Sequence, residues 1–215
     1  MTQSLHPAAQ KGFSLGAELY QQVRPSYPPE VIVWLQDQLK VGESSTVIDL
    51  GSGTGKFLPY LIQTQAKVIA VEPVTEMLEQ LQQSYITVEC LQTSSEQLLL
   101  KDESVNAIIC AQSFHWFSNI ETLKEMYRVL TPSGHLGLIW NQRDITVDWV
   151  KALADEIAPF EADTPRYHSE KWKQVFEHQV LFQFKGLQTF QLKHTGTVEH
   201  VVSKRLLSTS FIAAM

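Results

Sequence analysis

The 215-residue sequence has no apolar run approaching the roughly 18 residues that suggest a membrane-spanning helix. It also has no excess of positive charge, with 17 Lys and Arg against 23 Asp and Glu, and no segment concentrates the basic residues. A dedicated nucleic-acid-binding protein would normally carry a basic stripe, so this class is disfavoured. The N-terminus has no basic segment followed by an apolar one, which predicts no signal peptide and a cytoplasmic location.

Cysteine is scarce as well. Cys90 and Cys110 have no metal-ligand spacing, and each lies in an apolar run typical of a strand. We therefore expect buried thiols in a reducing compartment and no metal site.

The composition, 44% hydrophobic and 19% charged, is that of an ordinary globular protein. The length favours one domain with a substantial core. From Thr46 onward, short apolar runs alternate with helical patterns, and five successive β-α units predict a mostly parallel, doubly wound α/β sheet. The expected strands are Thr46–Leu50, Lys67–Val71, Ile86–Leu91, Val105–Cys110 and His135–Trp140. The expected helices are Glu30–Lys40, Lys56–Gln63, Thr75–Gln83 and Ser118–Leu130, with capping-box spacing at Ser118 and Glu121 and at a short helical turn over Ser94–Gln97.

Three glycines, Gly51, Gly53 and Gly55, follow the first strand and precede a helix. Such a turn lets the backbone approach a ligand at the helix N-terminus. A dinucleotide turn requires a glycine where Lys56 stands, and the P-loop spacing fails at two positions. The remaining pattern, Asp-x-Gly-x-Gly-x-Gly, looks like the S-adenosylmethionine (SAM) turn of class I methyltransferases.

An acidic residue, Glu72, ends the second strand, 17 positions after Gly55. A carboxylate at this place can accept hydrogen bonds from both hydroxyls of a ribose. It would serve a nicotinamide cofactor equally well, so it does not discriminate between the two.

With these residues the chain resembles the type 11 subset of class I SAM-dependent methyltransferases, near the trans-aconitate methyltransferase-like branch. The resemblance covers about Ala17 to Ala214. It rests on Tyr20-x-x-x-Arg24-Pro25-x-Tyr27-Pro28, Asp49-Leu-Gly51-Ser-Gly53-Thr-Gly55, Val71-Glu72-Pro73, Ser94-Ser95-Glu96-Gln97-Leu98, Ala111-Gln112-Ser113-Phe114-His115-Trp116-Phe117 and Trp140-Asn141-x-Arg143-Asp144.

The resemblance implies that the glycines pack under the methionine part of SAM, and that Asp49 orients their loop or the ammonium group. It places Glu72 at the ribose and Gln112 at the methyl-donor site. Pro73 and Met77 would flank the adenine. The whole implied cofactor set is Tyr20, Arg24, Asp49, Gly51, Ser52, Gly53, Gly55, Glu72, Pro73, Met77, Ser95, Glu96 and Gln112.

Methyl transfer from a sulfonium is an in-line displacement that mainly requires positioning. A carboxylate acceptor needs no base, only a cation or hydrogen-bond donors, for which Arg24 and Arg143 are candidates. His115 could act as a base or simply shape the pocket. Trp116 and Trp140 are candidates for the walls of the acceptor cavity, with a core tryptophan at a strand end as the equal alternative for each. Tyr27 is a further substrate-binding candidate.

DNA and RNA amino-methyltransferases of this fold carry a Pro-Pro-Tyr type element where this chain reads Ala111-Gln112-Ser113-Phe114. We therefore expect a small-molecule acceptor, a carboxylate or lipid-like compound. Methylation of protein or RNA, SAM binding without turnover, and a nicotinamide oxidoreductase stay open as alternatives.

The expected organisation is one domain: an N-terminal arm or lid (1–29), a SAM-binding core (30–141), an insert near the substrate site (142–185), and a C-terminal strand and helix (186–215). A helix is expected over Lys171–His178, a strand over Gly186–Lys193 and a helix over Val198–Leu207. Relative to the family pattern the chain is expected to lack its last helix and antiparallel last strand, leaving an open sheet edge and a monomer or dimer.

Overall fold

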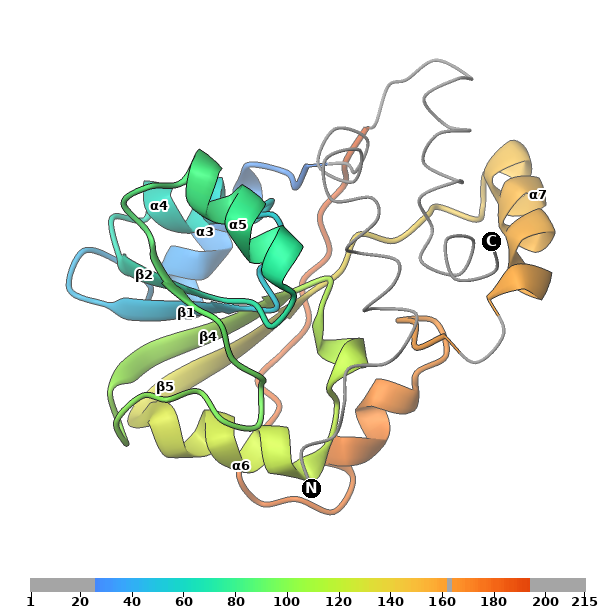
Figure 1. Ribbon diagram of the computed structural model, residues 1–215. Coiled ribbons are helices and arrows are strands. Elements are labelled where there is room, and N and C mark those ends of the chain that lie inside the picture. Colours follow the sequence, from blue (N-terminus) through green and yellow to red (C-terminus); the bar gives the residue numbers. More distant parts are fainter. Residues whose placement is uncertain (1–25, 162–163, 194–215) are drawn as a thin grey trace.

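A sheet of five parallel strands forms the centre of the computed structural model, which describes residues 26–161 and 164–193 (Figure 1). The strand order is β3-β2-β1-β4-β5. The strands are β1 (Thr46–Leu50), β2 (Lys67–Val71), β3 (Glu89–Leu91), β4 (Val105–Ala111) and β5 (Leu130–Ile139). The predicted parallel α/β fold is thus confirmed, and the predicted bounds of β1 and β2 agree with the structure.

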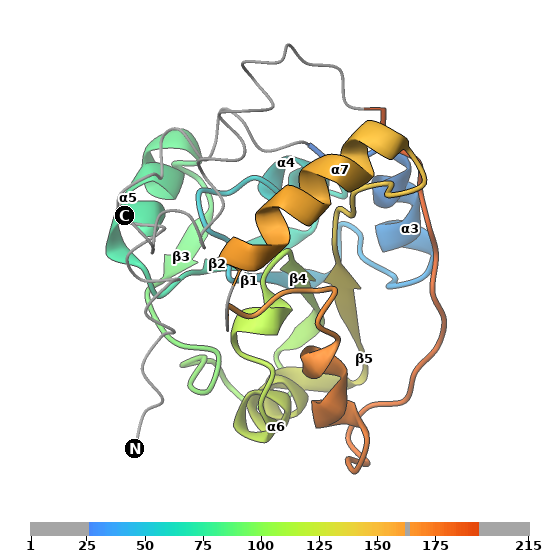
Figure 2. The ribbon, with the colours of Figure 1, turned by 90° about the vertical axis from the view of Figure 1, so that its right-hand side faces the viewer.

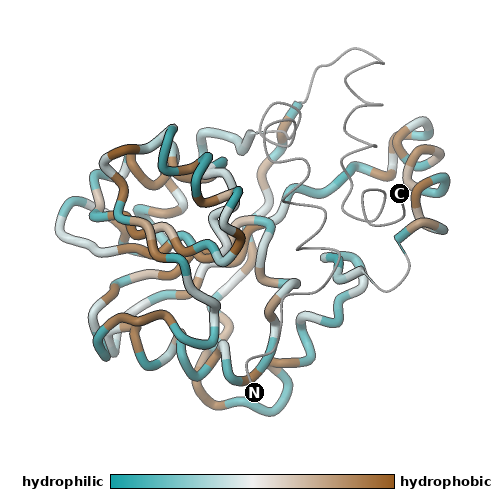
Figure 3. The backbone as a smooth tube through the Cα atoms, viewed as in Figure 1, coloured by the Kyte–Doolittle hydropathy of each residue, from teal (hydrophilic) through white to brown (hydrophobic). Residues whose placement is uncertain are grey.

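Helices cover both faces of this sheet (Figure 1). One face carries α3 (Glu30–Asp37), α4 (Leu58–Gln63) and α5 (Thr75–Ser84), and the other carries α6 (Ile120–Val129). Alternate strand residues supply the two cores: Val47 packs toward α3 and α4, whereas Ile48 and Leu50 pack toward α6. In Figure 3 the brown, hydrophobic stretches recur along the strands and within the helices.

Helix α6 starts two residues later than predicted, and the capping-box expectation at Ser118 and Glu121 is wrong. The side chain of Asn119 accepts a hydrogen bond from the Thr122 backbone N–H at 2.8 Å and caps the helix. Both serine and asparagine are good N-cap residues. The choice between two adjacent candidates depends on where the preceding short 3₁₀ helix η1 (Phe114–Trp116) ends.

Other elements are shorter than their sequence patterns predict. Helix α4 begins at Leu58 rather than Lys56, because the glycine turn extends through Gly55. Residues 94–97, where a short helical turn is expected, form a single turn that the Gln97 N–H closes to the Ser94 carbonyl at 3.2 Å. Strand β3 keeps only the last three residues of its predicted range, Glu89–Leu91.

After β5 the chain forms α7 (Asp148–Ile157) and the 3₁₀ helices η2 (Ala158–Phe160) and η3 (Lys171–Phe176). Helix α7 lies on the side toward which the carboxyl ends of the strands point (Figures 1 and 2). The helix expected over Lys171–His178 is therefore a shorter 3₁₀ helix. None of the helices in the described ranges is both long and apolar enough to span a membrane.

The strand expected over Gly186–Lys193 is wrong, since this segment has no regular secondary structure. Most side chains here are exposed, including Leu187 and Leu192, so the segment has no buried face of the kind that a strand in a sheet would have. Among the described residues β5 pairs only with β4. The predicted arm before residue 26, the helix over Val198–Leu207 and the chain end lie outside the described residues.

Candidate functional site

The sheet order places β1 and β4 side by side, with the chain leaving β1 toward α4 on one face and β4 toward α6 on the other. In open parallel sheets, ligands bind at the carboxyl edge at such a switch point. The turn after β1 is fixed there, because the Gly51 and Ser52 N–H groups both donate to the Val71 carbonyl, at 2.9 and 3.1 Å. The Ser52 hydroxyl donates to the Asp49 carbonyl at 2.6 Å.

The three glycines all have left-handed backbones, but their surroundings differ. A Cβ on Gly51 would lie 2.6 Å from the Ser113 Cβ, and one on Gly55 would lie 2.7 Å from the Tyr85 ring. These two glycines therefore allow close packing within the protein. At Gly53 the nearest atom to a Cβ is the Met77 sulfur, at 3.7 Å. Gly53 is thus the member of the turn with space for a ligand against its backbone.

Glu72 follows β2, and its carboxylate braces the glycine turn. Its two oxygens accept hydrogen bonds from the Gly53 N–H (2.8 Å) and the Val74 N–H (2.9 Å). Burial raises the pKa of Glu72 to about 7, although these two hydrogen bonds lower it. Each oxygen has a further lone pair with which it could accept a ribose hydroxyl.

Asp49 lies beneath this turn, in the penultimate position of β1. Its side chain is buried, and neither carboxylate oxygen has a hydrogen-bond partner among the described residues. Burial, with the nearby charge of Glu72 as a smaller cause, raises the pKa of Asp49 to about 7. A buried carboxylate without a partner is costly, and a bound cation would supply the missing interaction.

The residues expected around an adenine lie along the same edge. Pro73 and Met77 line the cleft beside Gly53. Ser95 and Glu96 also line it, but both are tied to the start of α6. The Ser95 hydroxyl lies 2.9 Å from that of Thr122, and Glu96 accepts from the Asn119 amide at 2.9 Å.

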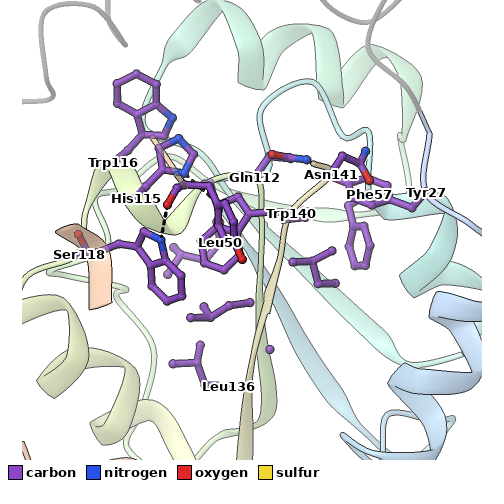
Figure 4. Close-up of a pocket in the computed structure, with 18 of the residues that line it drawn as sticks. Tyr27, Leu50, Phe57, Gln112, His115, Trp116, Ser118, Leu136, Trp140 and Asn141 are labelled. Atoms are coloured by element: carbon purple, nitrogen blue, oxygen red, sulfur yellow. Dashed lines mark hydrogen bonds between the residues drawn. The ribbon is translucent and has the colours of Figure 1, made fainter. Parts of the chain in front are cut away.

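Gln112 follows β4 directly. Its φ of +62° places a non-glycine residue in the left-handed region, while its N–H donates to the Ile139 carbonyl at 2.8 Å. Such strained positions concentrate at ligand sites. In Figure 4, Gln112 lies between His115 and Trp116 on one side of the pocket and Asn141 and Tyr27 on the other.

His115 and Trp140 form a hydrogen-bonded pair at the adjoining ends of β4 and β5. The Trp140 indole N–H donates to His115 Nδ1 at 3.1 Å. An imidazole nitrogen that accepts a hydrogen bond carries no proton, so this pair assigns the ring proton of neutral His115 to Nε2. His115 in this state presents a hydrogen-bond donor at Nε2, and its basic lone pair points at an indole.

The other residues expected at the acceptor site differ in where they lie. Trp116 lines the cleft next to His115, with ring centroids 5.2 Å apart. Tyr27 also lines it, but is 6% exposed and packs edge-on against Phe57. Arg143 is exposed at the cleft's edge. Tyr20 and Arg24 lie outside the described residues.

Two aromatic residues of this site, Tyr167 and Trp172, are not among those predicted from the sequence. The Trp140 ring lies 4.5 Å from that of Trp172 and 5.0 Å from that of Tyr167, centroid to centroid. Both partners come from the segment after α7, for which the sequence indicated only an insert over the active site. The available signal was a tyrosine and a tryptophan five positions apart in an otherwise polar stretch, which says nothing about what they contact.

Comparison with known proteins agrees with this geometry. A family model described as "Methyltransferase domain" matches residues 48–138. The methyltransferase-like protein C25B8.10 of Schizosaccharomyces pombe is 41% identical over 167 residues, which are 77% of this chain and 65% of that protein. The methyltransferase Mb3374 of Mycobacterium bovis is 33% identical, covering 92% of this chain and 85% of its own length. The chain spans 65% of C25B8.10 and 53% of a second fission-yeast relative, C25B8.09.

Solved structures show the same fold. A SAM-dependent methyltransferase from Aquifex aeolicus has a TM-score of 0.51 and 28% identity, covering 60% of this chain and 75% of its own. A protein from Methanococcus maripaludis has a TM-score of 0.57 at 17% identity, covering 82% and 87%. The chain belongs to the class I SAM-dependent methyltransferases, a family of enzymes.

Proposed function

We propose that this chain binds SAM at the carboxyl ends of β1, β2 and β4 and transfers its methyl group to a small-molecule acceptor. The observation that carries the proposal is the buried Asp49 carboxylate, without a hydrogen-bond partner among the described residues, beneath a turn in which a Cβ on Gly53 would meet only the Met77 sulfur, at 3.7 Å. SAM has an ammonium group and a sulfonium, so a cationic ligand fits this acidic pocket. A nicotinamide dinucleotide would place a pyrophosphate at the turn, against two carboxylates.

The residues divide the cofactor between them. Asp49 would face the positive groups of SAM, and Glu72 would hold its ribose. Gly53, which has no side chain, would leave space for SAM to pack against the backbone of the turn. Pro73 and Met77 would flank the adenine, and Ser95 and Glu96 would lie at its edge. When bound, the sulfonium supplies an activated methyl group, so the chain's own task is to position the acceptor and exclude water.

The acceptor side is best suited to a group that arrives already deprotonated. The indole donor at Nδ1 leaves His115 a hydrogen-bond donor rather than a base. A carboxylate can accept from such a donor and needs no proton removed. We therefore favour a carboxylate over a lipid-like hydroxyl. Arg24 and Arg143 stay candidate cations for it, and residues 1–29 and 142–185 are proposed to shape the acceptor side.

The motif resemblance supports placement near the trans-aconitate methyltransferase-like branch. A nucleic-acid substrate lacks support, because the sequence has neither a basic run nor a Pro-Pro-Tyr type element after β4. Methylation of a protein or RNA is therefore the second candidate to test, and binding without turnover is the third.

The experiment has two parts. Calorimetry with SAM and with NAD identifies the cofactor, and SAM binding with no response to NAD is expected. Label transfer from methyl-labelled SAM into a cell extract, separated into small-molecule and macromolecular fractions, then identifies the acceptor class. Label in protein or RNA alone would overturn the small-molecule proposal. NAD binding in place of SAM would overturn the cofactor assignment.

A further inference from the structure

A second cavity, of about 200 Å³, lies next to the cleft described above. His115 and Trp172 line both, as do Ser118, Pro165 and Arg166, so the two cavities adjoin along these side chains. Apart from His115 and Trp172, the lining of the second cavity consists of cationic, hydroxyl and proline residues: Ser118, Thr164, Pro165, Arg166, Ser169 and Lys171.

The charge of this lining is of one sign. Arg166 and Lys171 contribute positive charge, and no carboxylate belongs to the lining. Glu161 lies outside this lining and forms an ion pair with Arg166, with its Oε1 3.7 Å from Arg166 Nε. Its Oε2 lies 2.8 Å from His168 Nε2, so Glu161 is shared between two partners.

The cavity has an inner and an outer part. Thr164 is buried, and the Arg166 side chain is only 15% exposed, so the guanidinium belongs to the inner wall. Ser169 and Lys171 are exposed and belong to the outer wall. Hydroxyls and a forked guanidinium around a small volume match the hydrogen-bonding pattern of a carboxylate.

We propose that this cavity is a subsite for a second anionic group of the methyl acceptor, a carboxylate other than the one that receives the methyl group, held by Arg166 with Lys171 at the outer wall. The inference rests on the proposed function and deepens it, because it assigns the acceptor's charged end to the segment following α7. Arg166 is a binding residue in this scheme, and His115 separates the anchored group from the place of methyl transfer.

The test uses the whole chain saturated with S-adenosylhomocysteine, and ¹⁹F NMR of 4-fluorobenzoate and its uncharged analogue 4-fluorobenzamide. We expect the benzoate to bind at least about 10-fold more tightly than the amide, as charge-assisted hydrogen bonds imply. Arg166→Gln should weaken benzoate binding by about 10-fold or more, and Lys171→Gln by a smaller factor of about 2 to 5, since Lys171 is exposed. Neither should change the amide's affinity.

Lys67→Gln is the matched control, because it removes the same charge at the start of β2, where Lys67 pairs with Glu89 at 3.0 Å. It should leave benzoate binding within a factor of 2. Equal weakening by Lys67→Gln and Arg166→Gln, or equal affinities for benzoate and amide, would overturn the subsite. If Arg166→Gln does not fold, Arg166→Lys replaces it, because this variant keeps the positive charge but loses the forked guanidinium. Unchanged benzoate affinity in both Arg166→Lys and Lys171→Gln would also refute the subsite.

Calorimetry with S-adenosylhomocysteine on the same proteins separates this proposal from the proposed function. Failure of S-adenosylhomocysteine to bind the wild type contradicts the proposed function. Normal S-adenosylhomocysteine binding together with an Arg166→Gln variant that retains full benzoate affinity contradicts the subsite alone.

Discussion

Alanine substitution at Gly53 and at Gly51 should separate a ligand-facing glycine from a packing glycine. Both positions have left-handed backbones, with φ of +57° and +71°. An alanine there costs about 1 kcal/mol in conformational energy. At Gly53 little is added, because the new methyl would meet only the Met77 sulfur at 3.7 Å. Gly53→Ala should therefore lower the free energy of unfolding by about 1 kcal/mol.

Gly51→Ala has a second cost. Its methyl would lie 2.6 Å from the Ser113 Cβ and 3.1 Å from the Phe117 ring, and neither is the flexible end of a side chain. The Ser113 hydroxyl also donates to the Leu50 carbonyl at 2.6 Å, so Ser113 cannot move without losing that bond. Overpacking of this kind adds about 1–3 kcal/mol. The total loss expected for Gly51→Ala is about 2–4 kcal/mol.

Urea denaturation followed by circular dichroism measures the two stabilities, and calorimetry measures affinity for S-adenosylhomocysteine. Gly53→Ala should be nearly as stable as the wild type yet lose at least about 10-fold in affinity, because its methyl occupies the space assigned to the cofactor. Full affinity in Gly53→Ala, or equal destabilisation by both substitutions, would refute the division of roles.

Three further predictions concern charge, tautomer and packing. Asp49 has a pKa of about 7 in the fold against 3.8 for the free group, so between these values the folded state binds more protons than the unfolded state. This carboxyl thus makes the wild type progressively less stable from about pH 4 to 7, and Asp49→Asn should be more stable than the wild type at pH 8, by up to about 4 kcal/mol, with the difference gone near pH 4. Urea titrations at each pH check this, and a less stable variant at pH 8 would contradict it. Trp140→Phe removes the donor to His115 Nδ1, so long-range ¹H–¹⁵N spectra should change from a single Nε2–H tautomer to a mixture; a wild-type Nδ1–H signal would show the pair to be assigned wrongly. Arg128 joins α6 to the loop before β4 by donating to the Leu100 carbonyl at 2.9 Å, and within α6 it donates to Glu125 at 2.8 Å, so Arg128→Gln should cost about 1–2 kcal/mol in urea denaturation, whereas no loss would show these bonds to be of no consequence.

Local patterns in the chain determined the sheet. The short apolar runs over Thr46–Leu50 and Lys67–Val71 are buried on both sides, and strands of this kind form only under helices on two faces. The glycine spacing after β1 likewise specified a ligand turn, because left-handed backbones are a property of the residues themselves. The predicted family follows from these same local features.

Errors arose where a pattern needed a partner to become structure. The sequence of Gly186–Lys193 predicted a strand, but a strand exists only when a neighbouring backbone pairs with its N–H and C=O groups, and among the described residues β5 pairs with β4 alone. The α6 cap went to Asn119 rather than Ser118 for a related reason, since the end of η1 decides which residue meets the helix.

The chemistry of the site belongs to the tertiary structure. Spacing could place Asp49 near a cofactor, but its burial without a hydrogen-bond partner among the described residues comes from the packing of β1 beneath the turn. The pairing of Trp140 with His115 and the approach of Arg166 and Trp172 join residues 25 to 57 positions apart in sequence. Distances between such side chains depend on how segments far apart in the sequence fold back on each other, and no local pattern specifies that.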